Sequence, residues 1–472
     1  MVAGSTEIVW LGLDLRLADN PALEQAVAQG GAVLPVFIWA PEEESPWSPG
    51  AASRRWLGQS LAELQASLAR RGSKLTVRRG PTAEALLALA AESDAKSVFW
   101  NRRYEPAAIA RDRELERRLR QRGIAAAGCP GNLLFEPGTV LSANGKPCRV
   151  FTAFWRACLA MPGPPEPTSA PRRLRAPAQW PASLAISELG LEPNDGIHQT
   201  WQPGEQGASR RMKAFLSTAI ETYSAERDRP DLRGTSRLSP HLHFGEIGAR
   251  RIWHEARRHG AIADPFLRQI AWREFSCHLL FHYPHTPREA LRPEFRRFPW
   301  RMDAVGLRAW TRGMTGYPMV DAGMRELWHT GWMHNRVRML AASFLVKHLM
   351  IPWQEGAAWF WDTLVDADLA NNTMGWQWSA GCGADATPYF RIFNPVIQGR
   401  KFDPDGEYVR HWVPELARVP SQWIHQPWEA PASLLSKAGV ELGRNYPRPI
   451  VEHAAARKRA LVALRTRSLA GK

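Results

Sequence analysis

Cysteine is scarce in this chain of 472 residues. The five that occur are widely spaced, and no two of them form a Cys-x-x-Cys pair: Cys129, Cys148, Cys158, Cys277 and Cys382. This pattern argues against a disulfide framework, a zinc site and an iron–sulfur cluster. We therefore expect a cytoplasmic protein in a reducing environment, with no metal centre.

Targeting signals and long apolar runs are also missing. The N-terminus leads straight into a strand-like segment, Glu7–Leu13, without the basic region and apolar core of a signal peptide. The apolar run Met339–Val346 stops at Lys347, well short of the ~20 residues that cross a bilayer. No internal repeat is evident. These absences exclude a repeat array and predict a protein that has no membrane partner.

Basic residues are in excess. Lys and Arg number 61 against 46 Asp and Glu, which gives a net charge of +15 and a pI near 10.1. Such a balance suits a polyanionic partner, because phosphates neutralised by Lys and Arg release their counterions. A basic surface that serves only solubility explains the same numbers, so composition alone leaves nucleic acid as one of two alternatives. The 44% hydrophobic and 23% charged content is typical of a globular protein.

Strand and helix patterns alternate over the first 130 residues. Strands are expected at Glu7–Leu13, Ala32–Trp39, Lys74–Arg79, Ser97–Asn101 and Ile124–Gly128, and helices at Ser53–Arg71, Thr82–Glu92 and Ala107–Arg122. This alternation predicts a doubly wound, parallel, five-stranded sheet. Proline-rich sequence then reads as a long linker, followed by helices, a loop-rich stretch from 381 to 445 and a short basic helix. We expect an α/β domain at 1–135, a linker at 136–204 and an all-helical domain at 205–472.

Polar residues are concentrated in segments that otherwise read as buried helices. Three stretches carry Trp, Asn, Arg and Asp together: Thr330–Arg338, Asp366–Asn372 and Gly375–Gly381. A hydrophobic core has no use for so many hydrogen-bonding groups unless something polar is buried among them. Because tryptophan suits the wall of a large flat molecule better than that of a small ion, the pattern predicts a buried aromatic cofactor.

Helical spacing divides these polar residues between two surfaces. Tyr317–His329 and Met333–Met350 read as consecutive helices, with Gly331 as the break. On the second helix Asn335 and Arg338 share one face, whereas Arg336 points roughly 100° away. One face is therefore expected to line a pocket while Arg336 reaches another surface.

Two weaker patterns suggest a phosphate loop and a metal site. Gly381–Ala386 superficially matches a dinucleotide fingerprint, but such a loop must follow a strand and open a helix. Asp366 and Asp368 could bind a metal, although a helix cap or an ion pair is the commoner role for such acids. We therefore favour neither the phosphate loop nor the metal site.

Several of these motifs resemble those of one family. Residues 316–405, together with Trp272–Phe275 and Thr235–Ser239, closely resemble the DNA photolyase/cryptochrome flavoproteins. Val9–Pro21 resembles the family's opening motif, although residues 11–13 depart from its usual Phe-Arg-x. The resemblance covers nearly the whole chain. It implies a light-driven FAD enzyme that splits cyclobutane pyrimidine dimers in ultraviolet-damaged DNA, with a cryptochrome photoreceptor or a (6-4) photolyase as the alternatives.

The resemblance also implies which residues bind FAD. Thr235–Ser239 offers hydroxyls and N–H groups to a pyrophosphate, although an ordinary helix cap has the same composition. Arg338 and Asp366 are expected to pair beside the flavin ring. Asn372 matches the residue that faces the flavin's reactive nitrogen; plant cryptochromes carry Asp there, so an amide favours repair over signalling. The full set comprises Tyr223, Thr235, Ser236, Leu238, Ser239, Trp272, Asn335, Arg338, Asp366, Asp368 and Asn372.

Electron supply and DNA binding are inferred in the same way. Trp376, Trp353 and Trp300 match the family's chain of tryptophans from flavin to surface, although core packing explains any one of them. Four arginines match phosphate-binding positions: Arg227, Arg273, Arg336 and Arg391. Trp272 and Trp378 match the aromatics that hold the flipped lesion, with Met339 beside it.

The chain departs from the family's dimer-repair pattern at two places. Gln269 stands where dimer-specific photolyases usually carry Glu, and a Gln there resembles (6-4) photolyases. Ala107 and Ala108 fall where one branch binds a folate antenna through Asn and Glu. Whether the N-terminal domain binds an antenna chromophore is therefore left open. The candidates are methenyltetrahydrofolate in a differently built site, or a deazaflavin. Only about twenty residues follow Glu452, which argues against a long signalling tail, and we expect a monomer.

Overall fold

The computed structural model describes residues 5–142, 144–191, 200–385 and 391–469. The chain divides into two compact units. Unit 1 comprises residues 1–220, 236–284 and 365–368, and unit 2 comprises residues 221–235, 285–364 and 369–472. Both units therefore draw on the C-terminal half of the sequence. The expected division into an α/β domain, a linker and a helical domain stays a prediction.

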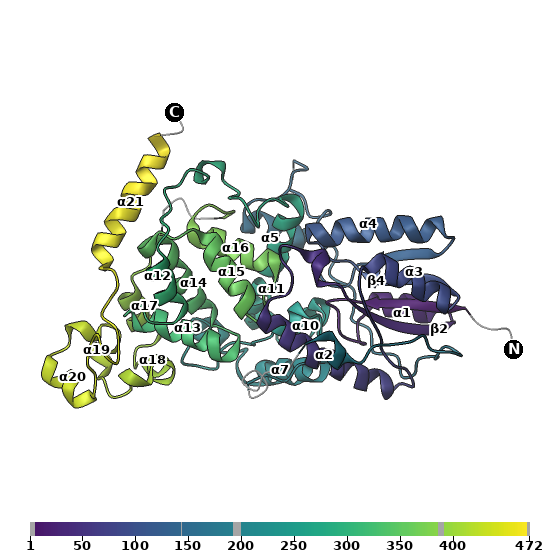
Figure 1. Ribbon diagram of the computed structural model, residues 1–472, viewed down its shortest axis with the longest axis horizontal. Helices are drawn as coiled ribbons and strands as arrows, with labels where there is room; N and C mark the ends of the chain where they lie inside the picture. Colours follow the sequence, from purple (N-terminus) through teal and green to yellow (C-terminus); the bar gives the residue numbers. More distant parts are fainter. Residues whose placement is uncertain (1–4, 143, 192–199, 386–390, 470–472) are drawn as a thin grey trace. The chain divides into compact units, whose positions relative to one another are not determined.

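A parallel sheet of five strands forms the N-terminal part of unit 1 (Figure 1). The strands run in the order β3-β2-β1-β4-β5, and every adjacent pair is parallel. Because the order proceeds outward from β1 in both directions, right-handed crossovers place helices on both faces. This confirms the predicted doubly wound sheet. The strands are β1 (Thr6–Leu11), β2 (Ala32–Trp39), β3 (Thr76–Arg79), β4 (Ala95–Asn101) and β5 (Ala125–Cys129).

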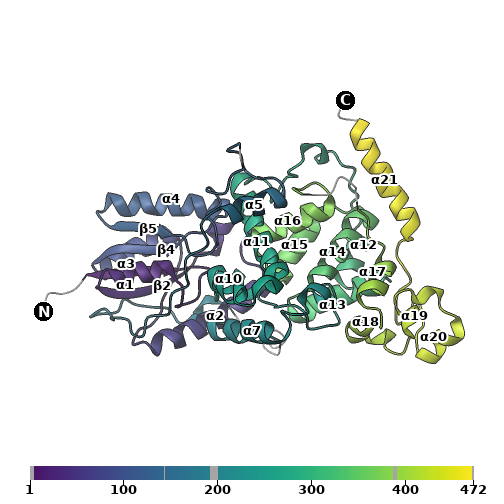
Figure 2. The ribbon, with the colours of Figure 1, turned by 180° about the vertical axis from the view of Figure 1, so that it is seen from behind.

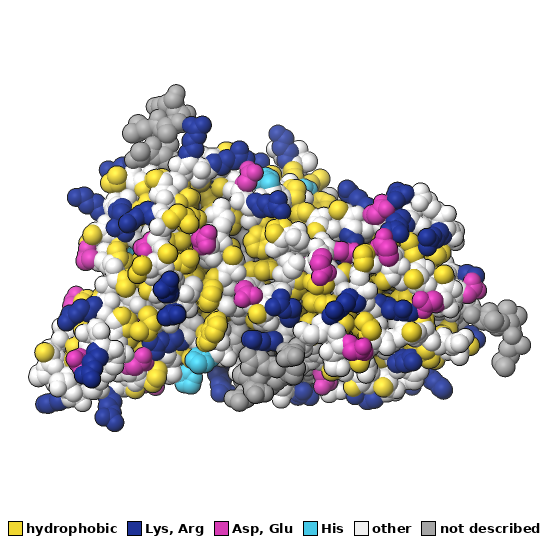
Figure 3. Space-filling model, in the orientation of Figure 1, with side chains coloured by type: hydrophobic (Ala, Val, Ile, Leu, Met, Phe, Trp, Pro, Cys, Tyr) yellow, Lys and Arg dark blue, Asp and Glu magenta, His cyan; other side chains and the backbone are white. Residues whose placement is uncertain are grey.

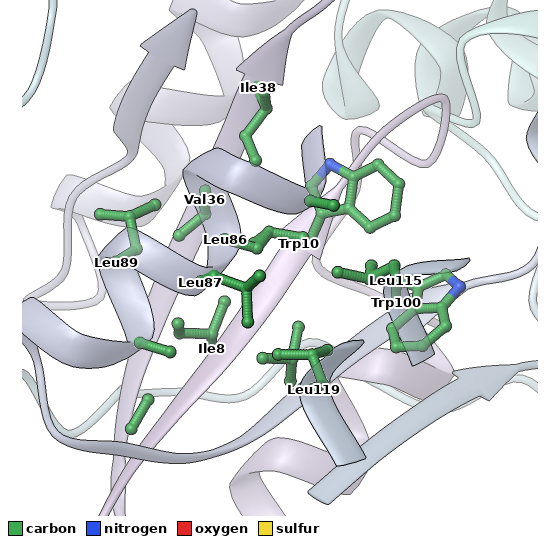
Figure 4. Packing of buried hydrophobic residues seen from close by; sticks show 14 of the residues in the cluster. Ile8, Trp10, Val36, Ile38, Leu86, Leu87, Leu89, Trp100, Leu115 and Leu119 are labelled. Atoms are coloured by element: carbon green, nitrogen blue, oxygen red, sulfur yellow. The ribbon is translucent and has the colours of Figure 1, made fainter. Parts of the chain in front are cut away.

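One face of the sheet packs on α3 (Thr82–Glu92) and α4 (Pro106–Gln121). Ile8 and Trp10 are two apart on β1, so their side chains share this face. Leucines of both helices cover them in a cluster that is almost entirely excluded from solvent (Figure 4): Leu86, Leu87, Leu115 and Leu119. The hydrophobic runs of the strands are thus explained by burial on both faces.

Helix α1 (Pro21–Ala28) is not among the elements predicted from the sequence. Its local signal is the pair Asn20-Pro21. The Asn20 side chain accepts a hydrogen bond from Leu23 N, at 3.2 Å, and Pro21 occupies the first turn, where no N–H is needed. Helix α2 (Ala51–Ala69) follows β2 and matches the predicted Ser53–Arg71.

The remaining helices of unit 1 include one long helix, α11, which buries residues on most of its circumference. It carries Gln269 and Trp272. The bounds of these helices are α5 (Phe151–Ala160), α7 (Glu205–Thr218), α9 (Ser239–His243), α10 (Ala249–Arg257) and α11 (Asp264–His282). Helices α5, α7, α10 and α11 are labelled in Figure 2, which shows the molecule from behind.

Unit 2 is helical. Its longer helices are α12 (Ala304–Thr311), α13 (Pro318–Thr330), α14 (Asn335–Ser343), α15 (Trp353–Thr363), α16 (Leu369–Ala380) and α21 (His453–Leu469). In the stretch from 381 to 445, predicted to be loop-rich, the described residues form four short α-helices: α17 (Pro395–Phe402), α18 (Glu407–Trp412), α19 (Ser421–Ile424) and α20 (Ala432–Ala438). None exceeds about two turns, so hydrophobic periodicity has too little length to reveal them.

The break between α13 and α14 lies where the sequence predicts it. Gly331 has a φ of 68° and ends α13 in the left-handed conformation that favours glycine. Helix α14 begins at Asn335 rather than at Met333, because the His334 side chain accepts from Arg336 N and caps it. Its continuation Phe344–Leu349 is π-helical. Within the described ranges, no helix is long and apolar enough to span a bilayer.

Candidate functional site

Trp376 on α16 is buried against α15. A Cβ atom at Gly356 of α15 would lie 2.0 Å from Cη2 of the Trp376 ring, so only glycine allows this approach. Phe360 and Trp310 pack edge-on against the same ring, with centroids 5.0 and 6.1 Å away. Trp353 is three residues before Gly356 and therefore on the same side of α15. The ring of Trp376 thus lies against the face of α15 that carries Trp353.

Trp300 lies in a segment before α12 that is hydrogen-bonded to the residues just before α15. Arg301 N donates to Met350 O, at 2.8 Å, and Met350 is three residues before Trp353. Trp376 and Trp353 are each 2% exposed, whereas Trp300 is half-buried. Trp300, the outer member of the predicted electron path, is thus the most exposed of the three. The role of the three tryptophans stays a prediction.

Asn372 on α16 has a fixed amide orientation. Its side chain lies 3.0 Å from the carbonyl oxygen of Ala357. A carbonyl only accepts, so the atom that approaches it must be the donating Nδ2. Oδ1 is thereby directed away from Ala357 as a hydrogen-bond acceptor. Asn372 and Trp376 are one turn apart on the same side of α16, which presents an acceptor and an aromatic ring together.

The hydroxyl-rich segment 235–239 forms a turn that leads into α9. Arg237 has a φ of 51°, and Leu238 N donates to Ser236 Oγ at 3.4 Å. Leu238 is buried, whereas Ser236 is half-buried and Ser239 is exposed at the start of α9. The turn therefore directs its apolar member inward and leaves the serines near the surface.

Tyr223 begins the short helix α8 (Tyr223–Glu226) of unit 2. Burial raises the pKa of its phenol to about 12, so the hydroxyl stays protonated as a donor. The guanidinium of Arg227 lies over its ring, 5.5 Å from the centroid. A predicted cofactor residue and a predicted phosphate-binding residue are thus in contact.

Arg336 is held by two groups within unit 2. Its Nη2 lies 2.5 Å from Asp228 Oδ2, and its guanidinium carbon is 4.5 Å from the centroid of the Phe402 ring. Arg227 Nε is 3.8 Å from the other oxygen of Asp228. One carboxylate therefore joins two arginines that are both predicted to bind phosphate. Nothing but the alternating charges of residues 226–229 hints at Asp228 in the sequence.

Arg273 is engaged inside unit 1. Its Nη1 donates to Asn132 O and to Glu274 Oε1, each at 3.1 Å. Glu274 is fully buried, and its Oε2 accepts from Leu134 N at 2.8 Å. Burial raises the pKa of Glu274 to about 7, against the opposing effect of Arg273. A phosphate contact by Arg273 stays a prediction. Arg273 would have to make that contact while it keeps its hydrogen bonds to Asn132 and Glu274.

Trp272 on α11 is stacked on Phe151, the first residue of α5. The two ring centroids are 3.8 Å apart and the planes are inclined by 7°. Arg268, one turn before Trp272, lies over Phe151 at 4.8 Å. Gln269 is half-buried and donates to Pro265 O at 3.3 Å. The stack fixes the ring plane of Trp272, and no sequence pattern singles out Phe151 for this task.

The other predicted site residues differ in exposure. Asp366 is buried, whereas Asn335 and Arg391 are exposed. Arg338 Nε donates to Met333 O at 2.6 Å. The expected Arg338–Asp366 pair stays a prediction. The half-buried members of the set are Thr235, Arg338, Met339, Asp368 and Trp378.

The metal and phosphate-loop alternatives gain no support. Among the described residues, no three His, Cys, Asp or Glu side chains are grouped to hold a metal ion. The Gly381–Ala386 pattern follows helix α16 rather than a strand, and its last residue lies outside the described ranges. All five cysteines are free and buried.

The fold is that of a flavoprotein of the photolyase type, as comparisons with known proteins show. The family model described as "DNA photolyase" matches residues 7–172, and that described as "FAD binding domain of DNA photolyase" matches residues 266–466. The chain belongs to the DNA photolyase family. This confirms the family, the fold class and the FAD cofactor inferred from the sequence.

Similar proteins include both named branches of the family. A deoxyribodipyrimidine photo-lyase of Agrobacterium fabrum is 48% identical over 97% of each chain. Cryptochrome-2 of Arabidopsis thaliana is 43% identical over 96% of this chain and 77% of that protein. The crystal structure of a bacterial class III photolyase from Agrobacterium tumefaciens superposes with a TM-score of 0.96 at 46% identity, covering 99% of this chain and 98% of that one.

Proposed function

We propose that the protein uses light to split cyclobutane pyrimidine dimers in ultraviolet-damaged DNA, as a deoxyribodipyrimidine photo-lyase. Its similarity to a protein of that name extends over nearly the full length of both chains. The structural observation that carries the proposal is Asn372, whose amide is oriented by Ala357 and cannot ionise. An acceptor that never gives up a proton suits a cofactor that returns to its starting state in each cycle.

The residues present fit a flavin. With its Nδ2 bonded to Ala357 O, the side chain of Asn372 leaves Oδ1 to accept from an N–H group of a cofactor. The 235–239 turn supplies hydroxyls, and buried Trp376 offers an aromatic neighbour on the same helix as Asn372. We assign flavin binding to the eleven residues predicted above. Bound FAD supplies, when it is reduced and excited by light, the electron that opens the dimer and is then returned.

The protein's own tasks are to bind DNA and to hold the lesion. Extruding the damaged bases costs a few kcal/mol, and less for a poorly stacked dimer. Trp272, fixed on Phe151, and Trp378 provide aromatic surfaces for the extruded bases, whereas Arg336, Arg227 and Arg391 bind the phosphates of duplex or single-stranded DNA. Arginine and lysine side chains are spread over the face seen in Figure 3, in keeping with a polyanionic partner. We further infer a monomer that acts in the cytoplasm.

Gln269 favours a second candidate, the (6-4) photolyase. A Gln can donate a hydrogen bond to a lesion carbonyl but delivers no proton. We expect dimer repair to need only the hydrogen bond and not the proton, so we rank dimer repair first. Blue-light repair of oligonucleotides that contain one defined dimer or one (6-4) lesion separates the two. Clearance of the (6-4) lesion alone would assign Gln269 the deciding role and overturn our proposal.

An antenna is a separate proposal. We infer that methenyltetrahydrofolate, or a deazaflavin, is bound by unit 1 outside the position marked by Ala107 and Ala108. The crystal structure of an archaeal photolyase from Sulfolobus tokodaii, 29% identical to this chain, has two FAD molecules, which supports a second chromophore site in such folds. Absorption of the purified protein beyond the flavin bands would identify which molecule is held.

A further inference from the structure

Three arginines lie close to the half-buried Trp300 in the sequence. It lies in a non-helical segment, residues 298–303, between a short 3-10 helix and α12. Arg296, Arg297 and Arg301 are exposed, and all lie within four residues of Trp300. Arg296 pairs with Glu289 at 2.7 Å, whereas Arg297 and Arg301 make no ion pair within the described part of the chain.

The charge balance around Trp300 is positive. Residues 296–304 contain three arginines and one acid, Asp303, whose Oδ1 is committed to capping α12 through Gly306 N at 2.8 Å. The positive charge of Arg301 also acts on Arg459 of α21. Burial and then Arg301 lower the pKa of Arg459. Arg297 and Arg301, for which no carboxylate partner is found among the described residues, therefore lie within three residues of a partly exposed indole.

We propose that Arg297 and Arg301 form a cationic mouth that draws anionic one-electron reductants to Trp300. The inference rests on the proposed function, in which Trp300 is the outer member of the tryptophan chain. Trp300 passes one electron inward to Trp353 and loses its indole proton to water. An enediolate anion such as ascorbate then gives one electron and one proton, which restores the indole and leaves the ascorbate radical anion.

The expected size of the effect follows from Coulomb's law. An anion roughly 8 Å from each of two guanidinium groups in water is concentrated about fivefold at low ionic strength. The gain disappears at high salt, where the Debye length shrinks to ~3 Å at 1 M. A neutral reductant gains nothing from the arginines. The cationic mouth should therefore favour anionic over neutral reductants, and this preference should disappear at high salt.

The first test needs no catalytic activity. In the holoenzyme, the fluorescence component that disappears in Trp300→Phe is quenched with iodide, with neutral acrylamide and with caesium. We expect iodide to quench this component about fivefold more strongly at low salt than at high salt, and Arg297→Gln/Arg301→Gln to abolish that difference. Acrylamide quenching should not change. The control Arg113→Gln/Arg122→Gln removes the same net charge from α4 and the residue after it, and should behave as wild type.

The second test follows light-driven reduction of the bound flavin by ascorbate or by neutral hydroquinone. The Arg297→Gln/Arg301→Gln variant should be slower with ascorbate alone. Equal iodide quenching in this variant and in the α4 control, or equal slowing with both reductants, overturns the cationic mouth. Full-speed photoreduction in Trp300→Phe instead overturns Trp300 as the exit. Dimer repair by chemically pre-reduced enzyme, measured in parallel, tests the proposed function independently of both.

Discussion

Several predicted site residues are held in one orientation by a neighbouring group. Asn372 is oriented by a backbone carbonyl, Trp272 by the ring of Phe151, and Arg336 by Asp228 and Phe402. A site that must place an electron donor and a damaged base accurately needs such supports, because a functional side chain that is not held in position works poorly. The effect of each support can be measured by changing one side chain at a time.

Trp376→Phe should slow light-driven reduction of oxidised FAD but spare repair by chemically pre-reduced enzyme. The reason is that the tryptophan chain supplies the flavin, whereas repair uses the flavin's own electron. Both rates are measured by absorbance under blue light. Trp423→Phe, at a half-buried position on α19, serves as the control. Equal loss of both activities would mean that Trp376 is structural or contacts the substrate.

Gly356→Ala should disturb Trp376 without removing it. The added methyl group would lie 2.0 Å from a rigid ring, and overpacking of this kind costs about 1–3 kcal/mol of unfolding free energy. We expect a lower midpoint in urea and slower photoreduction. Gly375→Ala is the matched control, since a Cβ there meets nothing within 4 Å. If the two variants are equally stable, the close approach of Gly356 to Trp376 is wrong.

Arg336→Ala should weaken binding to damaged and undamaged duplexes alike. Loss of one phosphate contact flattens the dependence of log K on log salt by about one unit. Titrations at several salt concentrations measure this slope, with Arg444→Ala as a control on a solvent-exposed arginine. An unchanged slope would place Arg336 away from the DNA.

His348 should make stability depend on pH. Burial and then the neighbouring His453 lower the pKa of His348 to about 3, and its Nε2 lies 2.8 Å from His453 Nδ1. Unfolded His348 titrates near 6.5, so between these values the unfolded chain binds more protons. The free energy of unfolding is therefore highest above pH 6.5 and decreases as pH falls below it, by at most ~1.4 kcal/mol per pH unit. Thermal melts of His348→Asn between pH 5 and 7 should show a weaker pH dependence than wild type. An identical pH dependence would mean that His348 is not buried as a neutral ring.

At the scale of elements, the sequence predicts what is periodic and local. The five strands are placed within about two residues, because alternating strands and helices with continuous apolar runs leave little choice. Gly331 ends α13 as expected. Helix α1 and the four short helices between 381 and 445 escape prediction, since each spans about two turns or fewer.

Contacts between distant segments could not be predicted in the same way. Phe151 meets Trp272, Asp228 meets Arg336, and Gly356 admits Trp376, yet no spacing rule links the members of these pairs. Each pairing depends on how complete helices pack, which local patterns in the sequence do not reveal. The residues expected to face the cofactor and DNA were inferred through family resemblance, whereas the residues that position them emerged only from the structure.

For the whole molecule, the photolyase family is established and the comparisons favour repair within it. The chain is 48% identical to a photo-lyase of which it covers 97%, and 43% identical to a plant cryptochrome of which it covers 77%. Asn372 favours repair over signalling. Gln269 is the residue that leaves undecided whether the lesion is a cyclobutane dimer or a (6-4) product. The central claim is therefore about substrate.

The most direct measurement is repair of defined lesions under blue light. Purified protein with fully reduced FAD is given saturating oligonucleotides that carry one cyclobutane dimer or one (6-4) lesion, and restored bases are counted per absorbed photon, with a dark sample as the control. We predict light-dependent repair of the dimer and none of the (6-4) lesion. A protein that binds FAD but leaves the dimer intact in the light would contradict the account.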